Sequence, residues 1–252
     1  MRVTVLDVPV DALTGTQTVE RLAELAATGS GAVALYVNAH ILNLAWQDAA
    51  FRSWLNEANL VRAGGQGVVW VSRWLGTPLP ERATFADIHE AFFERIEREQ
   101  RSCFLLGGRP GMAERAAAAV RRHWPDIVIA GTQHGYFNID EEAQVAQRIA
   151  EARPDVILVG MGSPRQEAWA MQWGKTLPVR LVCCVGAAFE QLAGVEPWAP
   201  AWVRRTGLEW LARLLRHPRR FWRRYLLGLP LFVCRVLVWR SRQHRARRAV
   251  GT

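Results

Sequence analysis

Short, continuously apolar runs alternate along this chain with longer segments in which apolar residues recur every three or four positions. The short runs are typical of parallel strands buried on both faces, and the longer segments are typical of amphipathic helices. The predicted strands cover 31–39, 102–108, 126–133, 154–162 and 179–189, and another ends at the glycine-rich turn in 59–70. The predicted helices cover 40–58, 85–99, 112–124, 141–152 and 164–174.

This alternation predicts an α/β fold, with a Rossmann-like, mostly parallel sheet and helices on both of its faces. Three predicted strands end in glycines, at Gly107 and Gly108, at Gly160 and Gly162, and at Gly186. Ligands of such sheets bind beyond the carboxyl ends of the strands, so we expect a small-molecule site there, such as one for a nucleotide. Glycines that only permit tight turns are the alternative. Neither GxGxxG nor GxxxxGK[ST] occurs, which argues against the corresponding NAD and ATP sites.

Charge is divided unevenly along the 252 residues. Residues 203–252 contain 14 arginines and one acid, a formal charge of +13, whereas residues 1–202 carry −4. We therefore expect an α/β domain in 1–202 and a basic, amphipathic helical appendage in 203–252. Such a segment indicates an anionic partner, unless it is simply a solvated basic face. The composition, 50% hydrophobic and 22% charged, excludes a disordered or collagen-like chain.

Nothing in the sequence predicts secretion or a membrane span. The N-terminus contains Asp7 and Asp11 and no long apolar stretch, and the four cysteines form no CxxC pair, so we expect a cytosolic chain without metal sites or disulfides. The most apolar segment, 225–239, is shorter than the roughly 18 to 20 residues of a spanning helix and contains Pro230 and Arg235. It fits either a helix lying at a membrane surface or an ordinary buried helix pair.

Segments 104–137, 154–169 and 185–228 resemble the WecG/TagA/CpsF glycosyltransferases, known as glycosyltransferase family 26. The resemblance runs from about residue 5 to about residue 232, and the final twenty residues fall outside it. It implies an inverting enzyme that transfers a sugar from a UDP-sugar to a polyprenyl-diphosphate-linked saccharide in bacterial exopolysaccharide or cell-surface polymer synthesis. It implies neither a metal nor another cofactor, and the sequence contains no DxD-type carboxylate pair.

The same resemblance implies a peripheral protein on the cytoplasmic face of the inner membrane, with an anionic membrane surface as a partner. No nucleic-acid partner is expected, because no helix-turn-helix, RRM, KH or zinc pattern accompanies the basic tail. The sequence does not decide whether the protein forms a homo-oligomer. The donor sugar also stays open, with N-acetylmannosamine, glucose and glucuronic acid all compatible.

Candidate site residues follow from the matched motifs. The resemblance implies catalytic roles for Asn38, which would orient a sugar hydroxyl, and for Gln166, which would lie near the reacting sugar. Asn38 is otherwise a cap for the next helix. The donor is expected to contact residues at the strand ends and in the matched segments: Gly108, Tyr136, Gly162, Arg165 and Glu190. Tyr136 is otherwise a core aromatic residue.

This chain departs from the family pattern at several positions. The family usually has an aspartate, proposed as the general base, where this chain has Gly64. Tyr36 stands where a threonine is common, Phe85 replaces a glycine, and Glu190 replaces an aspartate. Since a glycine side chain cannot accept a proton, the identity of the base is open.

Three explanations are compatible with the missing carboxylate. A substitute base is one, with Asp87, His40 and Glu190 as candidates and Asp87 as the preferred residue. A weakly base-assisted mechanism is another, and a catalytically impaired scaffold of a polysaccharide assembly complex is the third. Asp87 equally fits a helix N-terminal acid that follows Thr84.

The arginines of the basic segment are regularly spaced. Arg213, Arg216, Arg220 and Arg223 follow one another at intervals of 3, 4 and 3 residues, which predicts one helical face, with a break near Pro218. The resemblance implies that the acceptor diphosphate is bound by Arg213, Arg220 and Arg223. Arginine suits this role because its guanidinium can donate two parallel hydrogen bonds to phosphate oxygens. The arginines from Arg235 onward are expected to dock the tail on anionic lipid.

Overall fold

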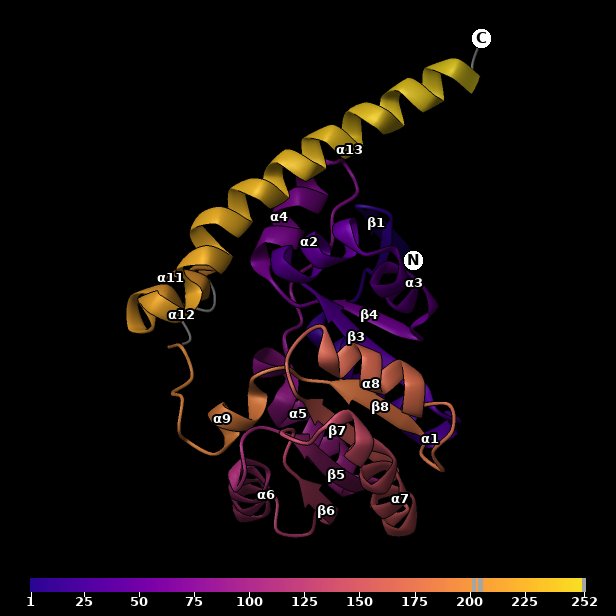
Figure 1. The fold of residues 1–252 in the computed structure, drawn as a ribbon, viewed down its shortest axis with the longest axis vertical. Helices are drawn as coiled ribbons and strands as arrows, with labels where there is room; N and C mark the ends of the chain where they lie inside the picture. The colour runs from indigo at the N-terminus through magenta and orange to yellow at the C-terminus, as the bar shows by residue number, and fades with distance from the viewer. Residues whose placement is uncertain (201–202, 204–205, 251–252) are drawn as a thin grey trace.

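A six-stranded, wholly parallel sheet forms the centre of the computed structural model, which describes residues 1–200, 203 and 206–250, with side chains up to residue 245 (Figure 1). The strand order is β4–β3–β8–β7–β5–β6. The bounds are β3 (Ala32–Val37), β4 (Leu60–Ala63), β5 (Ser102–Gly107), β6 (Val128–Gln133), β7 (Val156–Gly160) and β8 (Leu181–Cys184). The predicted α/β fold is confirmed. The boundary expected between 202 and 203 falls at residues that lie outside the described ones.

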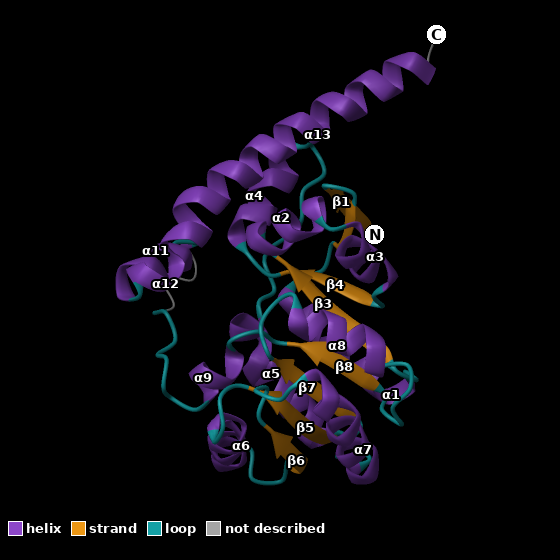
Figure 2. Cartoon of the chain, viewed as in Figure 1, coloured by secondary structure: helices purple, strands orange, loops and turns teal. Residues whose placement is uncertain are grey.

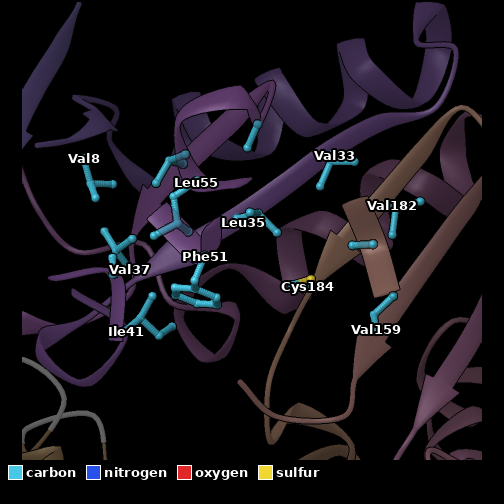
Figure 3. Close-up of a cluster of buried hydrophobic side chains, with 14 of the residues drawn as sticks. Val8, Val33, Leu35, Val37, Ile41, Phe51, Leu55, Val159, Val182 and Cys184 are labelled. Carbon is cyan, nitrogen blue, oxygen red and sulfur yellow. The ribbon is translucent and has the colours of Figure 1, made fainter. Parts of the chain in front are cut away.

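Helices cover both faces of the sheet (Figure 2). One face carries α1 (Gly15–Thr28), α5 (Phe85–Arg98), α6 (Met112–His123) and α9 (Ala188–Leu192), and the other carries α3 (Ala49–Glu57), α7 (Glu142–Ala152) and α8 (Arg165–Trp173). Successive strand residues point to opposite faces, so Leu35 packs in one core and Ala34 in the other. Figure 3 shows the core that contains Leu35, with Phe51 and Leu55 of α3. Burial on both faces explains the continuously apolar strands.

The segment 40–58, expected as one helix, forms two helices, α2 (Ala39–Gln47) and α3. The backbone of Asp48 between them is extended, and its side chain caps α3 by accepting a hydrogen bond from the Phe51 N–H at 3.0 Å. The expectation of a single helix is wrong because the apolar spacing continues across Asp48 although the backbone hydrogen bonds do not.

An N-terminal hairpin, which the sequence analysis does not predict, extends the body beyond β4. It pairs β1 (Arg2–Val5) with β2 (Val8–Asp11) in antiparallel fashion. The Asp11 carboxylate accepts a hydrogen bond from the Val61 N–H of β4 at 2.8 Å and pairs with Arg2 at 2.9 Å. The body is completed by α4 (Gln66–Trp74) and a short 3₁₀ turn, η1 (Ile139–Glu141).

The basic segment is helical, as expected, and is broken at Pro218. It comprises α11 (Glu209–Arg216), α12 (Pro218–Trp222), the π-helical turn η2 (Arg223–Leu227) and α13 (Gly228–Val250). Proline is the first residue of α12, where its missing N–H costs no hydrogen bond. Figure 1 shows α13 crossing α4 and α2 and extending past the body towards the C-terminus.

One face of α13 is fixed to the body. Phe232 and Val236 are buried, and the Asn43 side chain of α2 donates a hydrogen bond to the Gly228 carbonyl oxygen at 2.8 Å. Arg235 donates in return to the backbone and side-chain oxygens of Asn43 at 2.8 and 2.9 Å. One guanidinium nitrogen of Arg235 is therefore bonded within the protein, and the expected contact of this residue with lipid stays a prediction.

The opposite face of this segment is apolar and exposed. Its outward residues are Leu226, Leu227, Leu231, Val233, Leu237 and Val238. Among the described residues, none of the helices, α13 included, is both long and apolar enough to cross a bilayer. The buried-helix interpretation of 225–239 thus describes one side of the segment only.

Replacing Phe232 tests how firmly α13 is docked. Phe232→Ala removes a buried ring from the contact with the body and should lower the free energy of unfolding by about 3 kcal/mol. The exposed neighbour Leu231 provides the control, and Leu231→Ala should cost less than about 0.5 kcal/mol. Urea unfolding curves of both variants measure these losses. Coincident midpoints for the two variants would show that α13 is not docked through Phe232.

Candidate active site

A cavity of about 330 Å³ lies at the carboxyl ends of the strands, between the body and the C-terminal helices. Its floor is formed by residues that follow β3, β4, β7 and β8, including Asn38, Gly64, Gly162, Ser163 and Gly186. The opposite wall comes from α11, α12 and η2, through Trp210, Arg213, Arg220, Phe221, Arg224 and Tyr225. The small-molecule site expected at this edge of the sheet therefore has a matching cavity.

Tyr36 of β3 fills the space next to Gly64. A Cβ atom at Gly64 would lie 2.4 Å from Tyr36 Cδ2, and one at Gly186 would lie 2.5 Å from the phenol oxygen. Burial raises the pKa of the Tyr36 phenol, and the charge of Glu167 raises it further, so this hydroxyl stays protonated at neutral pH. The tyrosine and the two glycines form one close-packed unit on the cavity floor.

Gln166 lies beneath that floor and is fully buried. Its amide nitrogen donates to the Tyr36 hydroxyl at 3.3 Å and to Glu167 Oε1 at 2.8 Å, while its amide oxygen accepts from the Gly186 N–H at 3.2 Å. Gln166 thus joins the ends of β3 and β8 to α8. It is not among the lining residues, so any effect on a bound sugar passes through Tyr36 or Gly186.

Glu167 is the second buried polar residue at the start of α8. Its Oε1 accepts hydrogen bonds from Ser163 and Gln166, whereas Oε2 is buried without a partner among the described residues. Burial raises the pKa of this carboxyl group. Hence Glu167 holds Ser163, a lining residue, in place from below.

The position of Asn38 is compatible with both of its expected roles, a helix cap and a residue of the substrate site. Its side-chain oxygen caps α2 by accepting hydrogen bonds from the His40 and Ile41 N–H groups at 2.9 and 3.1 Å. The residue also lines the cavity. The cap leaves the amide nitrogen of Asn38 available to a ligand.

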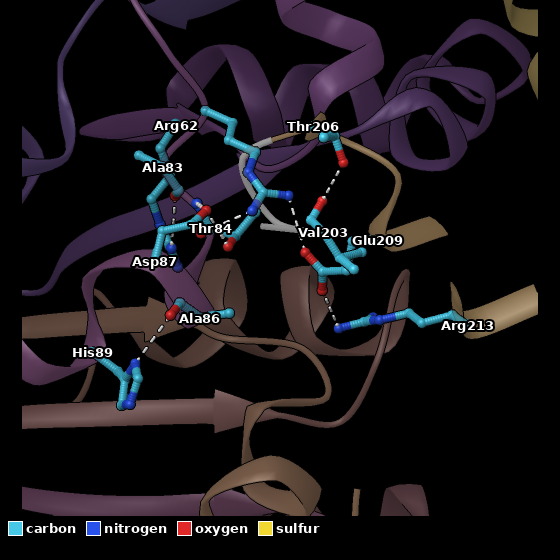
Figure 4. A network of polar contacts seen from close by, with 11 residues as sticks. Arg62, Ala83, Thr84, Ala86, Asp87, His89, Val203, Thr206, Glu209 and Arg213 are labelled. Atoms are coloured by element: carbon cyan, nitrogen blue, oxygen red, sulfur yellow. Dashed lines mark hydrogen bonds and ion pairs between the residues drawn. The ribbon is translucent and has the colours of Figure 1, made fainter. Parts of the chain in front are cut away.

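Asp87 belongs to an ion network at the rim, and it does not line the cavity. Its carboxylate caps α5 together with Thr84 and accepts from Arg82 at 2.9 Å. Arg82 also donates to Glu209 of α11 at 2.9 Å, and Glu209 accepts from Arg213 at 2.9 Å (Figure 4). The structure supports the helix-cap interpretation of Asp87 rather than a role as base, and the network ties α11 to α5.

His40, in contrast, lines the cavity from the first turn of α2. Burial and the neighbouring charge of Arg224 lower the pKa of its imidazole from 6.5 to about 4, so the ring is neutral at pH 7. Glu190 of α9, the third candidate base, does not line the cavity. Only one of the three candidates therefore faces the cavity.

The residues expected to bind the donor lie in two places. Gly162 lines the cavity, whereas Gly108, Tyr136, Arg165 and Glu190 lie outside its lining. Gly108 sits in a tight junction, donating its N–H to the Gly160 carbonyl at 3.0 Å, and Arg165 stacks on the Phe137 ring at 4.6 Å. Tyr136 is 65% exposed, so its alternative as a core aromatic is wrong.

The expected diphosphate arginines are only partly brought together. Arg213 and Arg220 line the cavity with Arg224, while Arg223 is exposed and stacks on the Trp222 ring. The family resemblance implies Arg223 for this role, whereas of the two arginines in the π turn 223–227 it is Arg224 that lines the cavity. The Nε of Arg224 is buried without a partner among the described residues.

Arg62 is a lining residue that the sequence analysis missed. It is 1% exposed, and its guanidinium donates to the carbonyl oxygens of Cys184 and Ala83 and lies over the rings of Tyr36 and Phe85. In the β3–β4 pairing it is directly opposite Tyr36. A charged residue inside an apolar strand run was the available signal, since a buried arginine needs specific partners.

Comparison with known proteins points to one group. The family model described as "Glycosyl transferase WecG/TagA/CpsF family" matches residues 3–246. The match extends past residue 232, so the expectation that the final twenty residues lie outside the resemblance is wrong for most of them.

Several characterised relatives are similar over most of their length. A Staphylococcus aureus protein is 31% identical over 237 residues, covering 93% of this chain and 92% of the relative. A Bacillus spizizenii protein is 31% identical over 207 residues, covering 82% and 79%, and one from Bacillus subtilis is 30% identical over the same length. All three carry the name N-acetylglucosaminyldiphosphoundecaprenol N-acetyl-beta-D-mannosaminyltransferase.

The contact between Tyr36 and Gly64 can be tested by a double-mutant cycle. Gly64→Ala should lower the free energy of unfolding by about 1–3 kcal/mol, because the new methyl group overlaps the tyrosine ring. In a Tyr36→Thr background the same change should cost much less, and urea unfolding of the four proteins measures the coupling.

Gly67 provides the control for this cycle, since a Cβ there meets nothing within 4 Å. Gly67→Ala should be close to neutral in both backgrounds. Equal losses from Gly64→Ala with and without the tyrosine ring would contradict the steric explanation. A carboxylate at position 64 is subject to the same overlap, so Gly64→Asp alone cannot report on the missing base.

Proposed function

The chain belongs to the WecG/TagA/CpsF family of glycosyl transferases, and on that premise we propose that it transfers a sugar from a UDP-sugar to a polyprenyl-diphosphate-linked saccharide. The relatives' names favour N-acetylmannosamine as the donor sugar and N-acetylglucosamine on the lipid diphosphate as the acceptor. The observation that carries the proposal is the cavity between the glycine-rich strand ends and the arginines of the C-terminal helices.

The arginine wall fits the chemistry of the transfer. When the acceptor hydroxyl attacks C1 of the donor sugar with inversion, negative charge develops on the departing diphosphate of UDP. Arginines and backbone N–H groups stabilise such charge without a metal, and the metal-independent transfer expected from the family remains our proposal. The backbone N–H groups of the glycine-rich strand ends serve the UDP diphosphate, and the lining arginines of the appendage serve the acceptor diphosphate.

We assign the two substrates to opposite sides of the cavity. The acceptor diphosphate binds Arg213, Arg220 and Arg224, which come from the appendage and leave the lipid pointing towards α13. The donor approaches from the glycine-rich ends of β5 and β7, where Gly108, Tyr136 and Arg165 lie. Asn38 and Ser163 lie on the floor between them and contact the sugars.

The membrane surface is the proposed partner of the exposed apolar face of η2 and α13. Trp70 and Trp74 of α4 are each 48% exposed, and Arg240 of α13 stacks on the Trp74 ring at 4.3 Å. Tryptophan and arginine next to an apolar face are typical of segments that lie in the headgroup region. This arrangement would place the cavity beside the cytoplasmic surface of the inner membrane, where a lipid-linked acceptor is found.

A transfer assay tests the proposal directly. The full-length protein is offered UDP-N-acetylmannosamine, UDP-glucose and UDP-glucuronic acid with N-acetylglucosaminyl-diphospho-polyprenol, and the lipid product is identified by mass spectrometry. We expect a product with UDP-N-acetylmannosamine. The second candidate function, a non-catalytic scaffold, is favoured by Gly64 alone, and UDP-sugar binding without product from any donor would support it.

Arg224 and Arg223 form a matched pair for testing the acceptor site. Arg224→Ala should raise the KM for the lipid acceptor by about 10- to 100-fold, because a hydrogen bond to a charged group contributes roughly 1.5–3 kcal/mol. Arg223→Ala should change this KM by less than about threefold, since its guanidinium lies outside the cavity. The opposite ranking would restore Arg223, the residue that the family resemblance implies.

Replacing two outward residues tests the membrane face. In Leu231→Glu/Val238→Glu, both substitutions lie on the exposed side of α13, and sedimentation with phosphatidylglycerol vesicles should weaken at least about tenfold. Val128→Glu is the control, because Val128 is 46% exposed on β6 at the far edge of the sheet. Equal binding by both variants would show that α13 does not carry the vesicle contact.

A further inference from the structure

The acceptor hydroxyl must lose a proton when it attacks the donor sugar, and the cavity offers few groups that can take it. Among the described lining residues, the side chains with an ionisable acceptor are Glu209 and His40. Tyr36 and Tyr225 also line the cavity, and burial raises the pKa of the Tyr36 phenol, which therefore keeps its own proton at neutral pH. The choice therefore lies between a carboxylate and an imidazole.

Glu209 is already engaged. Its two carboxylate oxygens accept hydrogen bonds from Arg82 and Arg213, each at 2.9 Å, and the residue anchors α11 to the body through Arg82. Protonation of Glu209 would break both ion pairs and release the wall of the cavity. Its contacts are those of a structural residue, and they leave His40 as the group free to act.

The His40 side chain has no hydrogen-bond or ion-pair partner within the described part of the chain, and it faces the cavity two residues after Asn38. The glycine turn that lacks the family's carboxylate packs against the same strand end, since a Cβ at Gly65 would lie 3.0 Å from Asn38 Cβ. His40 and Gly64 both line the cavity. Tyr36 prevents a carboxylate from occupying that position.

We propose that His40 is the general base of this enzyme. The imidazole nitrogen takes the proton of the acceptor hydroxyl as its oxygen bonds to C1 of the donor sugar. The bond between C1 and the diphosphate oxygen breaks, and UDP leaves with that electron pair. The imidazolium then returns its proton to water. The inference rests on the proposed function and names the residue that performs its central step.

The surroundings of His40 make its basicity depend on the substrate. The charged residues that face the cavity with it are Arg62, Arg82, Glu209, Arg213, Arg220 and Arg224. Arg224 contributes, after burial, to the lowering of the His40 pKa to about 4. Burial is the larger cause of the lowered pKa and persists when substrate binds. A diphosphate bound to Arg224 offsets the smaller, charge-based cause, so the imidazole becomes a better base when the acceptor is in place.

The test compares His40→Ala and His40→Gln with the parent and with His123→Gln, an exposed histidine on α6 outside the cavity. For both His40 variants kcat should fall about 10²- to 10⁴-fold, with the KM for each substrate and the binding of UDP-sugar changed less than about threefold. Added imidazole should restore activity to His40→Ala, and His123→Gln should match the parent. His40→Gln keeps a side chain in the cavity and serves if the alanine variant is poorly folded.

The pH profile supplies a readout that a structural role would not move. Because the neutral imidazole is the active form, activity should fall as pH decreases through the His40 pKa. The acid limb of kcat/KM, which reports the free enzyme, should lie near pH 4, and that of kcat should lie at a higher pH because bound diphosphate screens Arg224. Both limbs should be absent from His40→Gln.

Near-parental kcat in both His40 variants, or acid limbs that persist in them, would overturn the assignment while leaving the proposed function intact. A parent protein that forms no product with any donor would instead refute the proposed function itself. The two failures are therefore distinguishable in one set of assays.

Discussion

The Tyr36 ring occupies the space that a side chain at residue 64 would need, and this steric constraint governs the chemistry of the cavity. With a Cβ at residue 64 only 2.4 Å from the ring, no side chain fits there unless the tyrosine moves. The tyrosine is itself held by the buried amide of Gln166 below and by Arg62 opposite it in the sheet. The two departures that the family resemblance implies, at residues 36 and 64, are therefore sterically linked.

The C-terminal helices form one wall of this cavity. Arg213, Arg220 and Arg224 line the wall opposite the sheet, and the ion network from Asp87 through Arg82 to Glu209 holds α11 against α5. The concentration of positive charge after residue 203 thus serves an interior site as well as a surface. Arg235 is likewise bonded within the protein, because it donates a hydrogen bond to the Asn43 carbonyl oxygen and so fixes α13 to α2.

Much of the fold could be predicted because strands buried on both faces leave an unmistakable apolar run. Elements that depend on local backbone geometry could not. The hairpin between β1 and β2 turns through Leu6 and Asp7 at positive φ, without the glycine or asparagine that usually marks such a turn. In the site, the sequence indicated Asn38, Gly162 and Gly186, which line the cavity, whereas Gly108 lies outside the lining and Arg224 was missed.

A neutral base suits a cavity of this charge better than a carboxylate does. Glu209 is the one acid among the described lining residues, and it is already paired with Arg82 and Arg213. A second carboxylate on the floor would compete with the substrates' diphosphates for Arg220 and Arg224. The imidazole of His40 accepts a proton without that competition, and its basicity rises only once a diphosphate has bound. A neutral imidazole as base thus leaves the arginines free for phosphate.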